Sequence, residues 1–311
     1  MGILPNYNKE GPGVYVDDPK HGPFIRFFQT YASKFFKLCT TNLMFVLFNI
    51  PSIIVACLGV VYFLPQINDV FETTKFQKYL TDLGITAADS SMSSDAASMQ
   101  IYFLLVLLLV MFVVGMQLVA VGPVQTGLSY LYRSFAGETP TFLWLDFTSS
   151  VKSNWKQSTI VTFISLLVTS ITVMNIAFYA NVYSGKSSQI FSGIFGVIFV
   201  FYMCIQIFVY PLIASVDLKL KDIYKNSVLF FLGRLLPTMG IFLVDVVVLL
   251  VIPLVMLFSF TYAGFGLAIF YYLFFAFSFV HYLNTFFVWQ QIERYIIKPQ
   301  EIDEQSPEAA E

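Results

Sequence analysis

Charged residues are scarce in this chain. Only 12% of its 311 residues are Asp, Glu, Lys or Arg, whereas 57% are hydrophobic and Phe alone occurs 35 times. A soluble domain of this size carries roughly twice that charged fraction, so the composition indicates an integral membrane protein. The net charge of −2, without a strongly basic domain, argues against a nucleic-acid partner.

Residues suited to metal or nucleophilic chemistry are also few. Cys39, Cys57 and Cys204 lie in or at the edge of apolar runs without paired spacing, which indicates buried thiols rather than a disulfide or metal site. Only His21 and His281 provide imidazoles. The sequence contains no glycine-rich phosphate loop, HExxH motif or GxSxG motif. We therefore expect no enzymatic activity, no metal and no cofactor.

Apolar runs, in contrast, are long and numerous. A transmembrane helix needs about 20 residues, and six runs are long enough: 38–64, 100–122, 158–183, 188–214, 235–259 and 263–288. Short turns around Ser184-Gly185-Lys186 and Tyr262-Ala263-Gly264 join the last four runs into two antiparallel pairs. Residues 1–23 are polar and lack the apolar core of a signal peptide, so the first run is predicted to be a retained span.

The predicted fold is an all-α membrane protein in which six transmembrane helices form three antiparallel hairpins, with cytoplasmic amphipathic lead-in helices. Its parts are a polar N-terminal segment (1–23), a single membrane domain (24–298) with an external loop at about 65–99, and an acidic tail (299–311). Of the 17 Lys and Arg residues, only Lys75, Lys78 and Lys186 fall on the other side from the rest. This asymmetry predicts that both termini lie in the cytoplasm.

The polar stretch 122–161 separates two apolar runs. Thr139-Pro140 favours a helix start, and the spacing of Trp144, Phe147, Val151 and Trp155 is helical. We expect a short helix lying flat on the membrane and leading into the next span. Basic amphipathic stretches also precede the first and third hairpins, although any loop beside a membrane tends to have this composition. Candidate partner or lipid contacts are Trp144, Lys152, Asn154, Trp155, Lys156, Lys221 and Lys225.

The external loop is the longest segment on its side of the membrane. Residues 82–98 are small, polar and mildly acidic, so we expect poor order there. The loop is either a contact for an extracellular partner or a plain linker.

Asp245 is the only acid deep within a span, where a carboxylate costs a few kcal/mol. His281, in the following span, lies at similar depth if the two spans are antiparallel neighbours. We predict a hydrogen-bonded Asp245–His281 pair that acts as a proton relay or polar substrate contact, or that simply clamps two helices. Isolated amides on Gln117, Asn175, Gln206 and Asn284 have the same two interpretations. Prolines at positions 51, 211 and 253 are expected to kink their helices.

Several segments in order resemble the YesL-like family of bacterial membrane proteins. They are NLMFVLFNIPSIIVACLG (42–59), Gly122-Pro123, residues 126–133, FTSSVKSNWKQST (147–159) and DLKLKDIYKNSVLFFLGRLLPT (217–238). The chain departs from the family pattern after Pro51 and in its long external loop. The resemblance implies a small accessory protein found with oligosaccharide ABC importers of Gram-positive bacteria, and it carries no functional residues onto this sequence.

Two functions follow as hypotheses. The first is a non-enzymatic accessory subunit that contacts the permease pair or the solute-binding lipoprotein of a carbohydrate ABC importer, besides membrane lipids. The chain does not look like the permease itself, because Glu308-Ala309-Ala310 lies at the extreme C-terminus without the glycine of a coupling helix. The second is a proton-sensitive secondary transporter or channel that uses Asp245 and His281. A third and weaker hypothesis is an assembly or regulatory protein.

Overall fold

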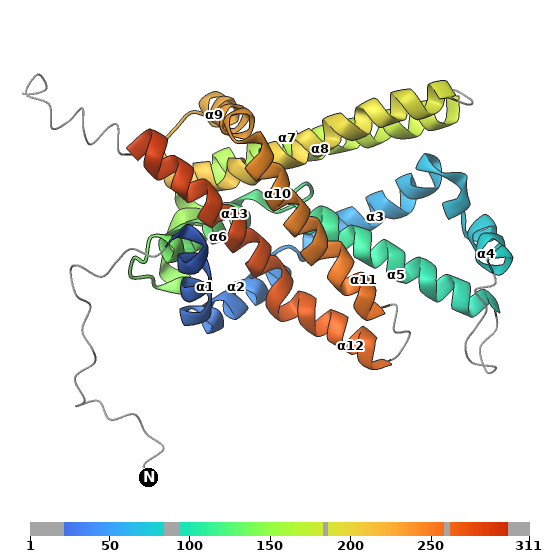
Figure 1. The fold of residues 1–311 in the computed structure, drawn as a ribbon, viewed down its shortest axis with the longest axis horizontal. Helices are drawn as coiled ribbons and strands as arrows, with labels where there is room; N and C mark the ends of the chain where they lie inside the picture. The colour runs from blue at the N-terminus through green and yellow to red at the C-terminus, as the bar shows by residue number, and fades with distance from the viewer. Residues whose placement is uncertain (1–21, 84–93, 183–185, 258–261, 298–311) are drawn as a thin grey trace, which may run out of the picture.

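The computed structural model describes residues 22–83, 94–182, 186–257 and 262–297, which form helices and no strand (Figure 1). Six helices are long and apolar enough to cross a membrane. They cover 50–67, 95–115, 143–181, 186–215, 235–257 and 263–297. The predicted all-α, multi-pass fold is therefore confirmed.

The helices follow one another with few connecting residues. The first half of the chain contains α1 (Pro23–Ser33), α2 (Phe35–Phe48), α3 (Ile50–Ile67), the 3₁₀ turn η1 (Asp69–Phe71), α4 (Thr73–Asp82), α5 (Ser94–Gly115) and α6 (Gly122–Ala136). The second half contains α7 (Leu143–Val182), α8 (Lys186–Ser215), α9 (Leu220–Gly233), α10 (Leu235–Val246), the π-helix η2 (Val247–Val251), α11 (Ile252–Leu257), α12 (Tyr262–Tyr271), the π-helix η3 (Tyr272–Ala276), α13 (Phe277–Ile292) and the π-helix η4 (Glu293–Ile297).

The first apolar run is divided at Asn49, between α2 and α3, so the single span predicted at 38–64 is wrong. Pro51 lies in the first turn of α3, where its missing N–H is not needed, and it begins a helix rather than kinking one. The Asn49 side chain accepts hydrogen bonds from Val121 N (2.9 Å) and Gln125 Nε2 (3.1 Å). The break therefore ties the first run to the start of α6.

The lead-in helix and the third span form one continuous helix, α7, so the separate flat helix predicted there is wrong. It contains no glycine or proline that would end it between residues 143 and 182. It begins at Leu143 rather than at Thr139-Pro140, because Thr139 instead donates to Ser134 O at the end of α6 (3.1 Å). The other two lead-in stretches do form separate helices, α1 and α9.

Helix α6 lies in the core, although the sequence analysis placed residues 122–136 in a polar surface stretch. It packs against α7, α8 and α13, and twelve of its fifteen residues are buried. Glycine allows this close approach. A Cβ at Gly122 would overlap with Ser158 O and Thr162 Oγ1, and one at Gly127 would lie 2.7 Å from Phe147 Cδ2. The glycines of α6 thus let neighbouring helices pack closely, so that protein rather than lipid surrounds its polar side chains.

Two pairs of neighbouring helices form the predicted hairpins. Helices α7 and α8 lie side by side, and α10–α11 packs against α12–α13 (Figure 1). Residues 262–264, predicted as a turn, begin α12, and the connection at 258–261 lies outside the described residues, as does the Ser184-Gly185 turn. Helix α1, the end of α6, the start of α7, α9 and the end of α13 gather at one end of the bundle (Figure 1). We call it the basic end because Lys34, Lys37, Arg133, Lys152, Lys156, Lys219, Lys221 and Lys225 occur there.

The segment predicted as an external loop has more structure than its composition indicates. Helix α4 buries Phe76 and Leu80, and Phe76 packs edge-on against Tyr102 of α5 with ring centroids 5.6 Å apart. Residues 94–98, predicted to be poorly ordered, form the first turn of α5. The rest of that prediction falls mainly on residues 84–93, which lie outside the described residues. Of the cysteines, Cys204 is buried, Cys39 is half-buried and Cys57 is exposed.

Candidate functional site

Asp245 and His281 both lie in the protein interior, where they are 0% and 2% exposed. The predicted hydrogen bond between Asp245 and His281 is wrong, because each side chain has another partner. Asp245 Oδ2 accepts from Asn284 Nδ2 at 3.0 Å, whereas His281 Nε2 contacts Gly115 O at the end of α5 at 2.8 Å. Asn284 lies one turn beyond His281 on the same face of α13, so the carboxylate pairs with the amide and the imidazole reaches a third helix.

These three residues, which we call the Asp245 cluster, do not use all their polar atoms. Asp245 Oδ1, His281 Nδ1 and Asn284 Oδ1 are buried without a hydrogen-bond partner within the described ranges. A buried polar atom without a partner typically costs about 1–3 kcal/mol. An ion or a water can satisfy such atoms.

Both spans that carry the cluster are interrupted by π-helices, η2 directly after Asp245 and η3 just before α13. Two tyrosines connect them, since Tyr271 Oη donates to Val248 O (3.1 Å) and Tyr272 Oη donates to Leu249 O (2.6 Å). Short π-helices are rare and occur frequently at functional sites. The irregular backbone is thus held by side chains from the neighbouring helix.

Asn42 of α2 stabilises η3 and was missed as a candidate by the sequence analysis. Its amide nitrogen donates to Tyr272 O (2.7 Å) and Leu273 O (2.6 Å), and its oxygen accepts from Ser278 N (2.7 Å). The available signal in the sequence was an asparagine within an apolar run. The structure buries it fully, but the sequence alone does not tell which backbone groups it satisfies.

The basic end presents aromatic and basic side chains together. Trp144 and Trp155 are 62% and 54% exposed, and Lys152 and Lys156 are exposed on the same helix. We call these four residues the aromatic–basic face of α7. The predicted contact Asn154 is half-buried, and its amide donates to Ser150 O (3.1 Å) and Ser153 Oγ (3.0 Å).

Lys221 and Lys225 are exposed on α9. The start of α9 is attached to α7, because Gln157 Nε2 donates to Leu218 O at 2.8 Å. The predicted contacts on α7 and α9 therefore lie at one end of the molecule. Both tryptophans among them belong to α7.

Arg133 of α6 is a half-buried cation at the basic end. Its guanidinium donates to Ala214 O at 3.0 Å and lies over the rings of Tyr130 and Trp289, 4.5 Å and 5.5 Å from their centroids. Burial lowers the pKa of this guanidinium below its ordinary value, against the opposing effect of Tyr130. The residue joins α6 to the ends of α8 and α13.

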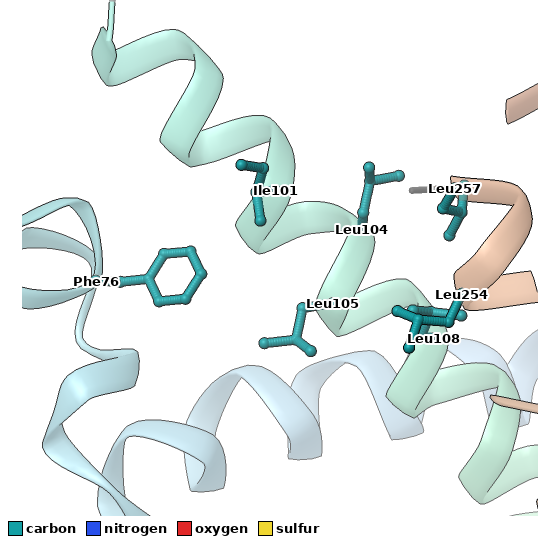
Figure 2. Close-up of a pocket in the computed structure, with 7 residues that line it drawn as sticks. All are labelled: Phe76, Ile101, Leu104, Leu105, Leu108, Leu254 and Leu257. Atoms are coloured by element: carbon teal, nitrogen blue, oxygen red, sulfur yellow. The ribbon is translucent and has the colours of Figure 1, made fainter. Parts of the chain in front are cut away.

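An apolar groove of about 200 Å³ lies away from the basic end. Figure 2 shows Phe76 of α4 on one side of α5 and Leu254 and Leu257 of α11 on the other, with Ile101, Leu104, Leu105 and Leu108 along α5 itself. All seven lining side chains are apolar, so the groove offers no hydrogen bond to a polar substrate. Its lining matches the hydrocarbon that surrounds the spans.

Within the described part of the chain, no three His, Cys, Asp or Glu residues lie close enough together to hold a metal ion. No curated protein and no solved structure matches this chain. Residues 101–176, which run from α5 through α6 into α7, match the sequence model of a family described as "Protein of unknown function, DUF624".

Proposed function

We propose that this chain is a non-enzymatic accessory membrane subunit associated with an oligosaccharide ABC import system. The observation that carries the proposal is the aromatic–basic face of α7, where two tryptophans are more than half exposed beside two lysines. Tryptophan is enriched among residues that dominate protein–protein binding. Such side chains on a membrane-embedded helix suit a partner that is itself bound to the membrane.

The choice of an ABC importer rests on the resemblance to YesL-like proteins. The family matched by residues 101–176 is found in YesL-like membrane proteins, which supports that resemblance. The proposed partners are the permease pair or the solute-binding lipoprotein. The two tryptophans belong to a helix that begins inside the matched segment.

A pull-down from native membranes in mild detergent tests this proposal. We expect the tagged protein to recover permease or binding-protein subunits, and Trp155→Ala to reduce that recovery several-fold. Phe103→Ala is the matched control, because Phe103 is also exposed (66%) but lies on α5. Recovery of no transporter component, or equal losses for the two variants, would contradict the proposal.

The second candidate is a proton-sensitive secondary transporter or channel that uses Asp245 and His281. The partnerless Asp245 Oδ1 and His281 Nδ1 favour it, as do the adjoining π-helices. Uptake measured in proteoliposomes under an imposed pH gradient separates it from the first proposal. The transporter hypothesis requires Asp245→Asn to abolish uptake in a protein that remains folded, whereas the accessory-subunit proposal expects the protein alone to transport nothing.

A further inference from the structure

A polar pocket lies at the basic end, between the first turns of α7 and the segment in which α8 ends. It has a volume of about 490 Å³, within the range of roughly 300–1,000 Å³ typical of small-molecule sites. Asp146, Ser149, Ser153 and Asn154 line it from α7, and Asp217 lies opposite. Unlike the apolar groove, it can form several hydrogen bonds with a ligand.

The pocket contains two carboxylates, those of Asp146 and Asp217. Asp146 and Asp217 have no ion-pair partner among the described residues. One oxygen of Asp146 accepts from Phe142 N at 2.8 Å and so caps the start of α7. Lys152 and Lys156 point to solvent from a neighbouring face of the same helix, and neither contacts an acid of the pocket.

The end of α8 adds to the negative potential. The last carbonyls of a helix carry partial negative charge and attract cations, and α8 ends at Ser215 on the wall of the pocket. Arg133 already responds to this potential by donating to Ala214 O.

Two hydroxyls of the lining are left without partners. Ser150 is only 5% exposed, and its Oγ has no hydrogen bond within the described part of the chain; the same is true of Ser215 Oγ. Orphaned buried hydroxyls require a partner, which a bound molecule can provide. They are an observation independent of the two carboxylates.

We propose that this pocket binds a small organic cation, with a primary amine or guanidinium group against Asp146 and Asp217 and further polar groups against the serines. Neutral polyols would leave both carboxylates uncompensated, and anions would be repelled by them. The assignment rests on the pocket and not on the proposed association with an ABC importer.

Isothermal titration calorimetry on the full chain in nanodiscs of neutral lipid tests the assignment. The probes are putrescine and agmatine, with erythritol as a neutral control and succinate as an anionic one, at matched ionic strength. We expect saturable binding of at least one diamine-type probe and none of the controls. Saturable binding of neither cation, or tighter binding of erythritol or succinate, would overturn the proposal.

Matched variants locate the binding. Asp217→Asn removes an exposed carboxylate of the pocket and is expected to weaken binding at least tenfold, and Ser150→Ala is expected to weaken it measurably. Glu138→Gln removes the same charge from an exposed acid at the basic end that does not line the pocket, and should leave binding unchanged. Equal effects of Asp217→Asn and Glu138→Gln would show that general surface charge attracts the cation, and would refute a specific site.

Discussion

At the scale of single residues, the interior of this protein depends on side chains that satisfy irregular backbone. Asn42 makes three hydrogen bonds of 2.6–2.7 Å to the region of η3, and water cannot replace them in a bilayer core. The buried asparagine therefore has a structural role that neither its neighbours in sequence nor its helix propensity would indicate.

We expect Asn42→Ala to lower the free energy of unfolding by about 2–4 kcal/mol, because it removes all three hydrogen bonds that Asn42 makes to the region of η3. Thermal unfolding in detergent, followed by tryptophan fluorescence, measures this change. Thr40→Ala is the control, since Thr40 is exposed on the same helix and bonds only to Phe36 O. Equal melting temperatures for Asn42→Ala and Thr40→Ala would show that η3 is stable without the hydrogen bonds of Asn42.

The Asp245 cluster gives a second prediction at this scale. Asp245→Asn keeps an acceptor for Asn284 Nδ2 and removes a buried ionisable group, so we expect stability to be unchanged or higher. Asn284→Ala instead leaves the carboxylate without its only hydrogen bond among the described residues, and should cost about 1–3 kcal/mol. Denaturation of both variants in the same detergent compares them. A larger loss of stability for Asp245→Asn than for Asn284→Ala would show that folding needs the carboxyl group itself.

At the scale of helices, the packing of α6 against α7 depends on glycine. Any side chain at Gly122 meets the backbone oxygen of Ser158, which cannot move without breaking α7. Overpacking of a core typically costs about 1–3 kcal/mol and occasionally more. The close approach also lets Gly122 N donate to Thr162 Oγ1 at 2.8 Å.

Gly122→Ala is therefore expected to destabilise the protein by at least about 3 kcal/mol or to prevent its accumulation in membranes. Gly240→Ala is the matched control, because no atom lies within 4 Å of the added Cβ on α10 and alanine is the better helix former. Yield and melting temperature after purification provide the measurement. Equal behaviour of the two variants would mean that α6 and α7 do not approach each other as described.

The same helix shows where sequence reasoning succeeds and where it ends. Hydropathy and length found a run at each of the six helices that are long and apolar enough to cross a membrane, but they merged α2 and α3 into one span. The runs were found because exclusion of polar groups from lipid acts on each span separately. Residues 122–136 instead contain Gln125, Thr126 and Ser129, and only their protein neighbours make burial possible. Partners of polar side chains depend on helix rotation, which is why Asp245 was expected to bond to His281 and instead accepts from Asn284.

At the scale of the whole molecule, α1 and the end of the last helix lie at the same end of the bundle, the basic end (Figure 1). The opposite end carries α4, with Lys75 tied to Asp69 (3.0 Å) and Glu72 (3.1 Å). A membrane potential and the insertion machinery favour lysines and arginines on the cytoplasmic side. We therefore predict that the basic end faces the cytosol, which is also where an ATP-dependent importer assembles its soluble subunits.

Cysteine labelling in a variant without Cys39, Cys57 and Cys204 tests this orientation. A membrane-impermeant maleimide should label Lys78→Cys on α4 in intact cells, whereas Lys156→Cys on α7 should react only after permeabilisation; both positions are exposed in the structure. Labelling of Lys156→Cys in intact cells would show that the orientation is the reverse of the one predicted. The aromatic–basic face would then meet extracellular partners, and the amine-binding pocket would sample the external medium, so this one measurement decides on which side of the membrane both proposals apply.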